Sequence, residues 1–382
     1  MRVALDISIL QAPRTGIGEY ALQLGRALQQ QAELELALFD GLGWRTDFPA
    51  NPRPGYGRLS RLARAALPGA YRIRRRIMQR RFDQGTRRLQ PQVYHQPTLW
   101  PLRFDGPTVM TLHDLTHVHY PETQPADRLR EIERRLPAAL DNASRVLVDS
   151  RFIAEEVARH YGVAEHKLQI APLGYASRFH PRSELQLQAR LTAHQLSMRS
   201  YYLCLGTLEP RKNLNTAISA YLGLPDDIRQ RLPLVIIGGH GWGHGWGQEQ
   251  LQCIPQQARS SGQIRLLGYQ DDMTTAELLA GAHALLFPSH YEGFGLPVLE
   301  AMASGTPVIA SNRGAIPEVA GNAASLIDPQ DVDSWRERMC ELLEDNLLHS
   351  TLVEQGMQRA RQFSWERCAQ ITLDTYKAVG NY

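Results

Sequence analysis

The sequence predicts an α/β protein built from two Rossmann-like domains. Short runs of aliphatic and β-branched residues alternate with stretches of helical period, a pattern typical of parallel sheets covered by helices on both faces. This alternation runs along the chain twice. With 382 residues, of which 43% are hydrophobic, the chain is too long for one ordinary core and long enough for two.

The first half of the chain supplies the elements of one such domain. Its predicted strands are short apolar runs: Val3–Ser8, Leu34–Phe39, Thr108–His113, Arg145–Asp149 and Gln169–Pro172. Stretches with the spacing of an amphipathic helix lie beside them: Gly18–Gln31, Ala126–Asp141 and Ser150–Tyr161.

The second half repeats the pattern. Its predicted strands are Tyr201–Gly206, Leu234–Gly238, Ile264–Gly268, Ala284–Pro288, Pro307–Ser311 and Ala324–Ile327. Its predicted helices include Asn213–Leu222, Thr275–Gly281, Pro297–Ser304 and Ser334–Leu343. A polar, glutamine-rich stretch from Pro181 to Ser200 separates the two patterns, so we expect domains at 1–182 and 183–363. We expect the helix at 364–382, beyond the last strand, to cross back onto the first domain.

Charge is unevenly distributed along the chain. The net charge is only +3, but the segment Arg53–Arg88 contains twelve arginines and a single acidic residue, so it carries +11 and the remainder −8. Apolar residues at helical spacing, among them Ile73, Ile77 and Met78, predict helices with a basic and an apolar side. Such helices fit an anionic membrane surface. A solvated helix over the first domain, or a basic acceptor groove, fits the composition as well.

The sequence disfavours several other classes of protein. No stretch approaches the ~18 apolar residues of a membrane-spanning helix, and Asp6 interrupts the first apolar run, so we expect neither a span nor a secretory leader. The four cysteines form no C-x-x-C pair, which favours reduced thiols in a cytoplasmic protein. Because zinc-finger spacing and aromatic-rich RNA-binding signatures are missing, nucleic acid is not expected as a partner.

The strongest motif is F-P-S-H-Y-E-G-F-G-L-P-V-L-E-A-M-A-S-G-T-P-V-I-A-S at 287–311, with the pattern strand, loop, helix, strand. Gly293 and Gly295 let the backbone approach a ligand closely, and the N-terminus of the following helix offers N–H groups to a phosphate. Glu292 precedes this helix and Glu300 lies one turn inside it, so the two carboxylates could contact different parts of one ligand. Alternatively, Glu292 only favours the helix dipole and Glu300 only faces solvent.

This motif closely resembles the signature of glycosyltransferase family 4, two glutamates separated by seven residues within E-G-F-G-L-P-x-L-E-A-M-A-x-G-x-P-V. The resemblance extends over the chain: G-T-L-E-P-R-K-N at 206–213 resembles the family's donor-phosphate loop, R-T-G-I-G-E-Y at 14–20 its N-terminal glycine loop, and T-L-H-D at 111–114 the strand end bearing its active-site histidine. The resemblance implies the GT-B fold, with an acceptor domain at 1–182 and a nucleotide-sugar-binding domain at 183–363 facing across a donor cleft. It also implies retaining glycosyl transfer.

The resemblance also implies roles for single residues. Lys212 with Arg211 would hold the donor diphosphate and stabilise it as leaving group. Glu292 would contact the transferred sugar, His113 would hydrogen-bond that sugar from the first domain, and Glu300 would bind the ribose. Two glycines of the first domain would close on the phosphates, and three backbone positions of the second would contact the sugar: Gly16 and Gly18, and Phe294, Gly295 and Leu296.

One position departs from the family pattern. Many relatives carry an arginine directly after the glycine that matches Gly206, whereas this chain has Thr207. Either Arg211 replaces that charge, with Thr207 a neutral contact to the donor, or the diphosphate rests mainly on Lys212. The chain has three lysines against 39 arginines, so a lysine in this loop favours a specific need for an ammonium group. The purely structural alternatives are a solvated Lys212, a buried His113 whose hydrogen bonds are made within the protein, and a plain turn before a helix at 16–18.

We expect no metal and no other cofactor. Asp331-Val-Asp333 has the letters of the D-x-D motif with which many other glycosyltransferases hold a divalent ion, but helix capping accounts for it. The repeat H-G-W-G-H-G-W-G at 240–247 has two histidines four residues apart, but its glycines are incompatible with a helix that would bring them together.

The prediction is therefore a hexosyltransferase that moves mannose or rhamnose from a GDP-sugar onto a lipid-linked glycan in O-antigen or surface-polysaccharide synthesis. The segments 112–121 and 206–213 resemble those of bacterial O-antigen and capsule mannosyltransferases most closely. The expected location is cytoplasmic, peripheral at the inner face of the cytoplasmic membrane. The alternatives are a UDP-sugar-dependent transferase of the same family and a non-catalytic scaffold that binds a sugar nucleotide.

Overall fold

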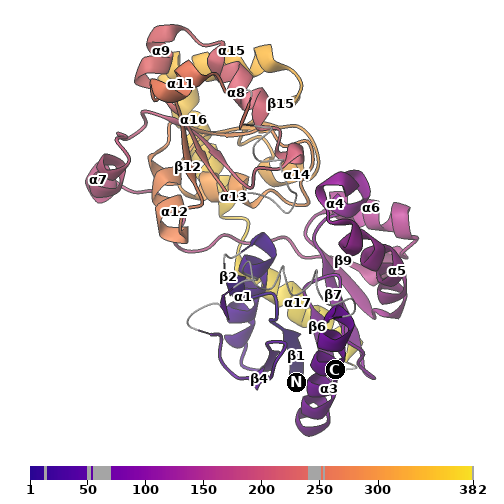
Figure 1. Cartoon of the computed structure of the whole chain (residues 1–382). Coiled ribbons are helices and arrows are strands. Elements are labelled where there is room, and N and C mark those ends of the chain that lie inside the picture. Colours follow the sequence, from indigo (N-terminus) through magenta and orange to yellow (C-terminus); the bar gives the residue numbers. More distant parts are fainter. Residues whose placement is uncertain (13–14, 50–52, 55–69, 240–250, 253, 381–382) are drawn as a thin grey trace. The chain divides into compact units, whose positions relative to one another are not determined.

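The computed structural model describes residues 1–12, 15–49, 53–54, 70–239, 251–252 and 254–380 (Figure 1). The chain forms two compact units. Unit 1 comprises Met1–His113, Arg130–Leu173 and Trp365–Tyr382, and unit 2 comprises Asp114–Leu129 and Gly174–Ser364. The chain thus passes between units at 113/114, 129/130, 173/174 and 364/365. The sequence analysis placed divisions at 182/183 and 363/364. The H-G-W-G repeat at 240–247 and residues 55–69 of the arginine-rich segment lie outside the described residues.

Unit 1 contains a seven-stranded sheet of order β4-β3-β1-β6-β7-β8-β9, parallel except for the β3–β4 pair. Its strands are β1 (Arg2–Asp6), β3 (Glu35–Phe39), β4 (Trp44–Arg45), β6 (Val93–Gln96), β7 (Thr108–Leu112), β8 (Arg145–Val148) and β9 (Leu168–Ile170). Two short strands, β2 (Gln11–Ala12) and β5 (Arg53–Pro54), pair separately. The five strands predicted for this half are all present within one or two residues, whereas β6 was not predicted.

Helices cover both faces of this sheet. The helices that lie wholly in unit 1 are α1 (Gly16–Gln29), α3 (Ala70–Leu89), α6 (Arg151–Tyr161) and α17 (Trp365–Val379), and α5 (Ala126–Asn142) begins in unit 2. α17 packs against α1, and its Tyr376 hydroxyl lies 2.5 Å from Nδ1 of His95 on β6. The preceding residue, Tyr94, contacts Phe82 of α3. Because successive strand residues point to opposite faces, α17 and α3 cover opposite sides of the sheet.

Unit 2 contains a six-stranded, fully parallel sheet of order β12-β11-β10-β13-β14-β15. Its strands are β10 (Tyr202–Leu205), β11 (Leu234–Ile237), β12 (Ile264–Gly268), β13 (Ala284–Phe287), β14 (Val308–Ser311) and β15 (Ser325–Ile327), close to the predicted ranges. The chain builds outward from β10 on one side and then from β13 on the other. This is the doubly wound topology, and its switch point lies between β10 and β13.

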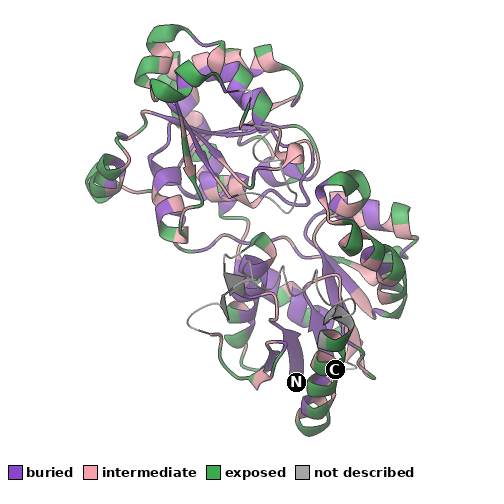
Figure 2. Ribbon diagram, viewed as in Figure 1, coloured by how far each residue is buried: buried purple, intermediate pink, exposed green. Residues whose placement is uncertain are grey.

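The helices of unit 2 again lie on both faces. They are α4 (Thr116–His119), α7 (Glu184–Ala193), α8 (Leu214–Leu222), α9 (Asp226–Arg231), α11 (Gln256–Ser260), α12 (Asp272–Gly281), α13 (Leu296–Ala303), α14 (Ile316–Ala320), α15 (Val332–Glu344) and α16 (Asn346–Ala360). The Tyr202 hydroxyl donates to the Met339 carbonyl of α15, and that of Tyr201 to the Leu278 carbonyl of α12. The central strands of both sheets are buried, edge strands such as β9 and β15 are only partly so, and the helices keep exposed outer sides (Figure 2).

Two expectations about unit 2 have a definite outcome. The predicted join at 181–200 contains α7, whose N-terminus has a capping box between Ser183 and Gln186. Its apolar side is narrow, with only Leu187 and Leu191 buried, so its hydrophobic period is weak. The capping prediction for Asp331 is confirmed, because its carboxylate accepts a 3.1 Å hydrogen bond from the Ser334 amide at the start of α15.

Candidate active site

The strongest candidate site lies at the carboxyl edge of the sheet in unit 2. β10 and β13 are adjacent parallel strands, so their carboxyl ends meet at one edge, beside the switch point. The loop after β10 contains a short 3₁₀ helix, Pro210–Lys212, and the loop after β13 contains Glu292. The structure therefore brings together Arg211, Lys212 and Glu292, three residues that the sequence analysis had assigned to the site.

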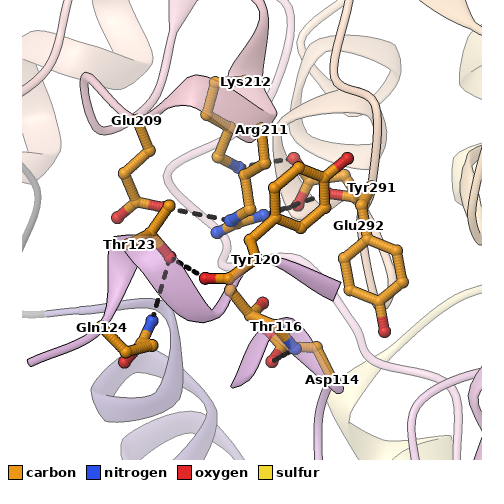
Figure 3. Close-up of polar contacts among 10 residues, drawn as sticks. All are labelled: Asp114, Thr116, Tyr120, Thr123, Gln124, Glu209, Arg211, Lys212, Tyr291 and Glu292. Atoms are coloured by element: carbon orange, nitrogen blue, oxygen red, sulfur yellow. Dashed lines mark hydrogen bonds and ion pairs between the residues drawn. The ribbon is translucent and has the colours of Figure 1, made fainter. Parts of the chain in front are cut away.

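Glu292 is held by two cations (Figure 3). Its Oε1 lies 2.6 Å from Nζ of Lys212, and its Oε2 lies 3.1 Å from Nη1 of Arg211. Nε of Arg211 donates to Oε2 of Glu209 at 3.0 Å. The side chains of Glu292, Lys212 and Arg211 are only 9%, 11% and 14% exposed, so water screens these charges weakly.

This arrangement fixes the charge states of the cluster. Burial by itself would raise the pKa of Glu292, but the charges of Lys212 and Arg211 outweigh it and the pKa is lowered. Burial lowers the pKa of Lys212, with Glu292 opposing the shift. For Arg211, burial is outweighed by the carboxylates of Glu292 and Asp114, which raise its pKa. Glu292 is thus a carboxylate and Arg211 a cation at neutral pH.

Arg211 also fixes the backbone of the loop after β13. Its Nη1 donates to the carbonyl of Tyr291 at 3.1 Å, and its own carbonyl accepts a 2.7 Å hydrogen bond from the amide of His290. The hydroxyl of Tyr291 in turn accepts from the amide of Leu115 at 2.9 Å. Residues 290–292 are therefore held from two sides before any ligand binds.

Two glycines, Gly295 within the motif at 292–295 and Gly314 after β14, allow the backbone conformation around Glu292. Gly295 caps α13 with φ +96°, a left-handed conformation that favours glycine. A Cβ atom on Gly314 would lie 2.8 Å from the carbonyl oxygen of Glu292, so only glycine fits against that backbone. The amide of Ala315 donates to the same carbonyl at 3.0 Å. Glu292 is thus positioned by the loop after β14 as well.

The other donor-binding positions predicted in unit 2 lie around the same loop. Phe294 is buried against Phe363, and Leu296 begins α13. Glu300 lies on α13 and is half-buried, so it is not simply a solvated helix residue. Thr207, in the loop after β10, is exposed.

The predicted positions of the first domain belong to unit 1. His113 follows β7, and its Nδ1 lies 2.7 Å from Oδ2 of Asp149, which follows the adjacent strand β8. Its Nε2 lies 3.3 Å from the carbonyl of Pro97. Both partners are hydrogen-bond acceptors, so both contacts form together only when the imidazole is doubly protonated. The ring edge also packs against Tyr20 of α1. His113 thus has protein partners, as the alternative interpretation expected.

Gly16 and Gly18 lie in the first turn of α1, which begins two residues earlier than predicted. The amide of Gly18 donates to the N-cap side chain of Thr15 at 3.2 Å. A Cβ atom at Gly16 would meet no heavy atom within 4 Å, so packing within unit 1 does not require glycine there.

The sequence analysis missed several residues of these sites. Asp149 directly follows β8 and Asp114 lies two residues after β7, at strand ends that often carry functional side chains in parallel sheets, and this was the available signal. Glu209 and Tyr291 carried no signal in the sequence beyond their place in the motifs at 206–213 and 287–311. The D-x-D acids are engaged within α15: Asp331 caps it, and Asp333 pairs with Arg336 at 3.0 Å. The absence of a metal requirement stays a prediction.

Comparison with known proteins identifies the family. The family model described as "Glycosyltransferase Family 4" matches residues 14–177, and the one described as "Glycosyl transferases group 1" matches residues 193–359. The chain is 34% identical over 389 residues to the Escherichia coli protein "O-antigen chain mannosyltransferase B", covering 99% of this chain and all of that one. It is 29% identical over 276 residues to the E. coli "Serotype-specific mannosyltransferase WbdA", covering 70% of this chain and 33% of that protein.

Solved structures share the fold. Sucrose-phosphate synthase from Thermosynechococcus elongatus superimposes with a TM-score of 0.75 at 22% identity, covering 99% of this chain and 98% of that one. WaaG, a glycosyltransferase involved in lipopolysaccharide biosynthesis, gives 0.66 at 16% identity, with 99% of both chains covered. Together with the two doubly wound sheets and the paired glutamates, these matches show that the chain belongs to glycosyltransferase family 4 and is a glycosyltransferase with the GT-B fold.

Proposed function

We propose that this chain transfers a mannosyl group from GDP-mannose to the glycan of a lipid-linked O-antigen intermediate, with retention of configuration. The observation that carries the proposal is the cluster of Lys212, Arg211 and Glu292 at the switch point of unit 2. Its cations are suited to a diphosphate, and its carboxylate is suited to sugar hydroxyls. The choice of mannose is supported by two E. coli relatives named as mannosyltransferases.

The chemistry follows from the charges. The bond from the sugar to the β-phosphate breaks with build-up of negative charge on the diphosphate, and a fixed ammonium group stabilises that charge. Lys212 is the candidate for this ammonium group, because its Nζ is buried and is held in contact with Glu292. Arg211 makes three contacts to Glu209, Tyr291 and Glu292. We propose that Arg211 mainly holds the loop after β13 in place, so that the diphosphate is bound mainly by Lys212.

His113 is the candidate for contact with the transferred sugar from unit 1. Asp149 holds its Nδ1 and thereby sets the orientation of the ring. The contact from Nε2 to Pro97 is longer, at 3.3 Å, so it is the more easily exchanged for a sugar hydroxyl.

The donor is tested by measuring transfer from GDP-mannose, a GDP-linked deoxyhexose and UDP-glucose to a lipid-linked, mannose-terminated oligosaccharide. Transfer from GDP-mannose alone supports the proposal. A preference for UDP-glucose would replace the donor. Tight binding of one sugar nucleotide without any turnover would favour a non-catalytic scaffold. The anomeric configuration of the product, determined by NMR, tests retention.

We further propose that α3 attaches the protein to an anionic membrane. Its Phe82 is buried in unit 1, whereas Ile73 and Ile77 on the outer side are 60% and 44% exposed. Arg76 and Arg80 are exposed at the same four-residue spacing. Exposed isoleucines between arginines fit the boundary between lipid headgroups and acyl chains. Within the described residues, no helix is long and apolar enough to cross a membrane.

Flotation with lipid vesicles tests this attachment. The protein is expected to float with vesicles containing phosphatidylglycerol, less so as salt rises, and not with pure phosphatidylcholine. Ile77→Glu should abolish flotation without lowering transfer to a water-soluble acceptor. Binding that is indifferent to salt and to Ile77→Glu would remove α3 from this role.

A further inference from the structure

A separate hollow in unit 2 is not explained by the donor cluster. It is an open cavity of about 360 Å³ lined by Tyr120, His290, Arg313, Pro329 and Gln330. His290, Arg313 and Gln330 each follow the carboxyl end of one of three consecutive strands, β13, β14 and β15. The cavity therefore lies at the same edge of the sheet as Glu292, on the side of the switch point toward β15.

The wall of this cavity is organised by one carboxylate. Oδ2 of Asp328 lies 2.6 Å from Nη2 of Arg313, and its Oδ1 accepts a 2.9 Å hydrogen bond from the amide of Gln330. The amide of Arg313 donates to Oγ of Ser311 at 3.1 Å. The side chain of Arg313 and the backbone at Gln330 are thus held in place by protein contacts, and the side chain of Gln330 is exposed.

Pro329 is fixed from the other side. Its carbonyl accepts hydrogen bonds from Nδ2 of Asn213 at 2.9 Å and from Oγ1 of Thr216 at 2.7 Å. Asn213 directly follows Lys212 in the donor loop. The cavity wall and the loop that carries Lys212 are therefore parts of one hydrogen-bonded assembly.

The cavity also shares residues with the surroundings of Glu292. His290 is two positions before Glu292, and its amide is bonded to the carbonyl of Arg211. Burial raises the pKa of Tyr120, and the charge of Arg211 opposes the shift, so the phenol lies within the electrostatic reach of that guanidinium. A ligand in the cavity would thus lie beside the reacting end of the donor.

The charges of the cavity favour a neutral ligand. Arg313 is compensated by Asp328. Burial lowers the pKa of His290, although Asp328 opposes the shift, so the imidazole is neutral at pH 7. The raised pKa of Tyr120 keeps its hydroxyl protonated. The remaining functions are amide, imidazole, guanidinium and hydroxyl groups beside an aromatic ring, a combination suited to a hydroxyl-rich sugar.

We propose that this cavity binds an uncharged sugar residue of the acceptor glycan, with Arg313, Gln330 and His290 hydrogen-bonding its hydroxyls and Tyr120 packing on the ring. The proposal rests on the proposed function, because only a transferase has an acceptor to position. It makes these residues determinants of acceptor specificity, separate from Lys212 and Glu292, which contact the donor.

The test compares Gln330→Ala and His290→Ala with Arg338→Ala, a matched control in an exposed ion pair on α15. Transfer to a soluble methyl glycoside of a mannose oligosaccharide is measured while the concentrations of acceptor and GDP-mannose are varied separately. Each cavity variant should raise the acceptor KM about tenfold, as expected for a lost hydrogen bond, and leave the donor KM and the melting temperature near those of wild type. Arg338→Ala should change neither KM.

Binding of the same glycoside, followed by saturation-transfer NMR without donor, separates the two proposals. If wild type transfers no mannose but binds the glycoside and Gln330→Ala does not, the proposed function fails and the cavity assignment stands. An unchanged acceptor KM in both variants, or a raised donor KM instead, would overturn the assignment. Displacement of the glycoside by millimolar inorganic phosphate would also overturn it, because it would identify an anion site.

Discussion

The carboxyl edges of the two sheets have similar topology and different electrostatics. In unit 1 the switch point lies between β1 and β6, where the Tyr94 hydroxyl lies 2.5 Å from Oε1 of Gln96 and 3.4 Å from Oδ2 of Asp6. Burial raises the pKa of Asp6, which favours its neutral form. In unit 2 the switch point holds Lys212, with Arg211 and an ionised Glu292 beside it.

This difference shows that the topology supplies a place for a ligand and the side chains decide which ligand fits. The cations of unit 2 complement the negative charge of a diphosphate. The polar side chains at the switch point of unit 1 are hydrogen-bonded to one another and do not. In unit 1 the residue that we propose for a role in the chemistry is His113, one strand further along and held by Asp149. We therefore propose that unit 2 binds the donor diphosphate and that unit 1 contributes a contact with the transferred sugar through His113.

The largest expected effect comes from removing the ammonium group. Lys212→Ala should lower kcat for transfer by about 10²- to 10³-fold, because a fixed charge that stabilises the leaving group is lost. Steady-state kinetics with GDP-mannose measures this, and Lys167→Ala is the matched control, since Lys167 contacts only a backbone carbonyl in unit 1. An equal loss of kcat in both variants would contradict the assignment of the donor diphosphate to unit 2.

Removing Arg211 should mainly affect stability. Arg211→Ala removes the ion pair between Arg211 and Glu209 and leaves Glu292 with one cation, and breaking a buried ion pair costs about 3–5 kcal/mol. Urea denaturation measures the loss. Arg211→Lys should recover only part of it, because lysine cannot contact Tyr291 and both carboxylates in the same way. An Arg338→Ala variant, with its exposed pair, should lose less than about 1 kcal/mol.

Buried histidines predict a loss of stability in acid. Burial lowers the pKa of His283 in unit 2 to about 4 and that of His95 in unit 1 to about 3. In the unfolded chain these histidines have a pKa of about 6.5, so the unfolded chain binds protons before the folded chain does as the pH falls. Their contribution to the free energy of unfolding is therefore complete above that pKa and is lost progressively down to pH 4. Each group should contribute about 3 kcal/mol or more. Urea midpoints between pH 7 and pH 4.5 measure it, and His283→Gln should flatten the dependence. An unchanged slope would contradict the assignment.

A smaller effect is expected from the carboxylate that orients His113. Asp149→Asn keeps the size of the side chain but removes its charge, so the ring is held less firmly. Transfer should fall about tenfold to a hundredfold, the range expected when a contact group is slightly misplaced. The KM for GDP-mannose should change little, because the diphosphate contacts are in unit 2. A large rise in that KM would instead place the residue at the donor phosphates.

The sequence was informative where function and fold depend on local pattern. The strands that carry the site are continuous apolar runs, the strand-loop-helix order of 287–311 placed Glu292 in the loop before a helix, and the resemblance of 206–213 to a donor-phosphate loop identified Lys212. β6 was missed because its residues Tyr94, His95 and Gln96 are polar, and the buried His95 has its hydrogen-bond partners on β7 and on α17, where Tyr376 is 281 positions away. α7 was missed because two buried leucines make a weak pattern, although its capping box was present.

The details of the site depended on contacts that no local pattern contains. The clamp of Arg211 on residues 290–292 needs two loops that are 80 positions apart. The cavity around Arg313 and Gln330 needs three strand ends to meet, and its neutral character depends on Asp328, a residue with no motif of its own. Tyr120 joins them only through the folding of the segment 114–129 into unit 2.

The assignment of the donor to the cluster in unit 2 is tested most directly by calorimetric titration of GDP-mannose into wild type, Lys212→Ala and Lys167→Ala. The account predicts that wild type and Lys167→Ala bind with the same Kd and that Lys212→Ala binds at least about tenfold more weakly, the loss expected for one charged contact. Lys212→Ala breaks a buried ion pair and is expected to melt at a lower temperature than the other two proteins, so the titrations are made at a temperature at which all three are folded. An unchanged Kd for Lys212→Ala would contradict the account, because the diphosphate would then rest on other residues.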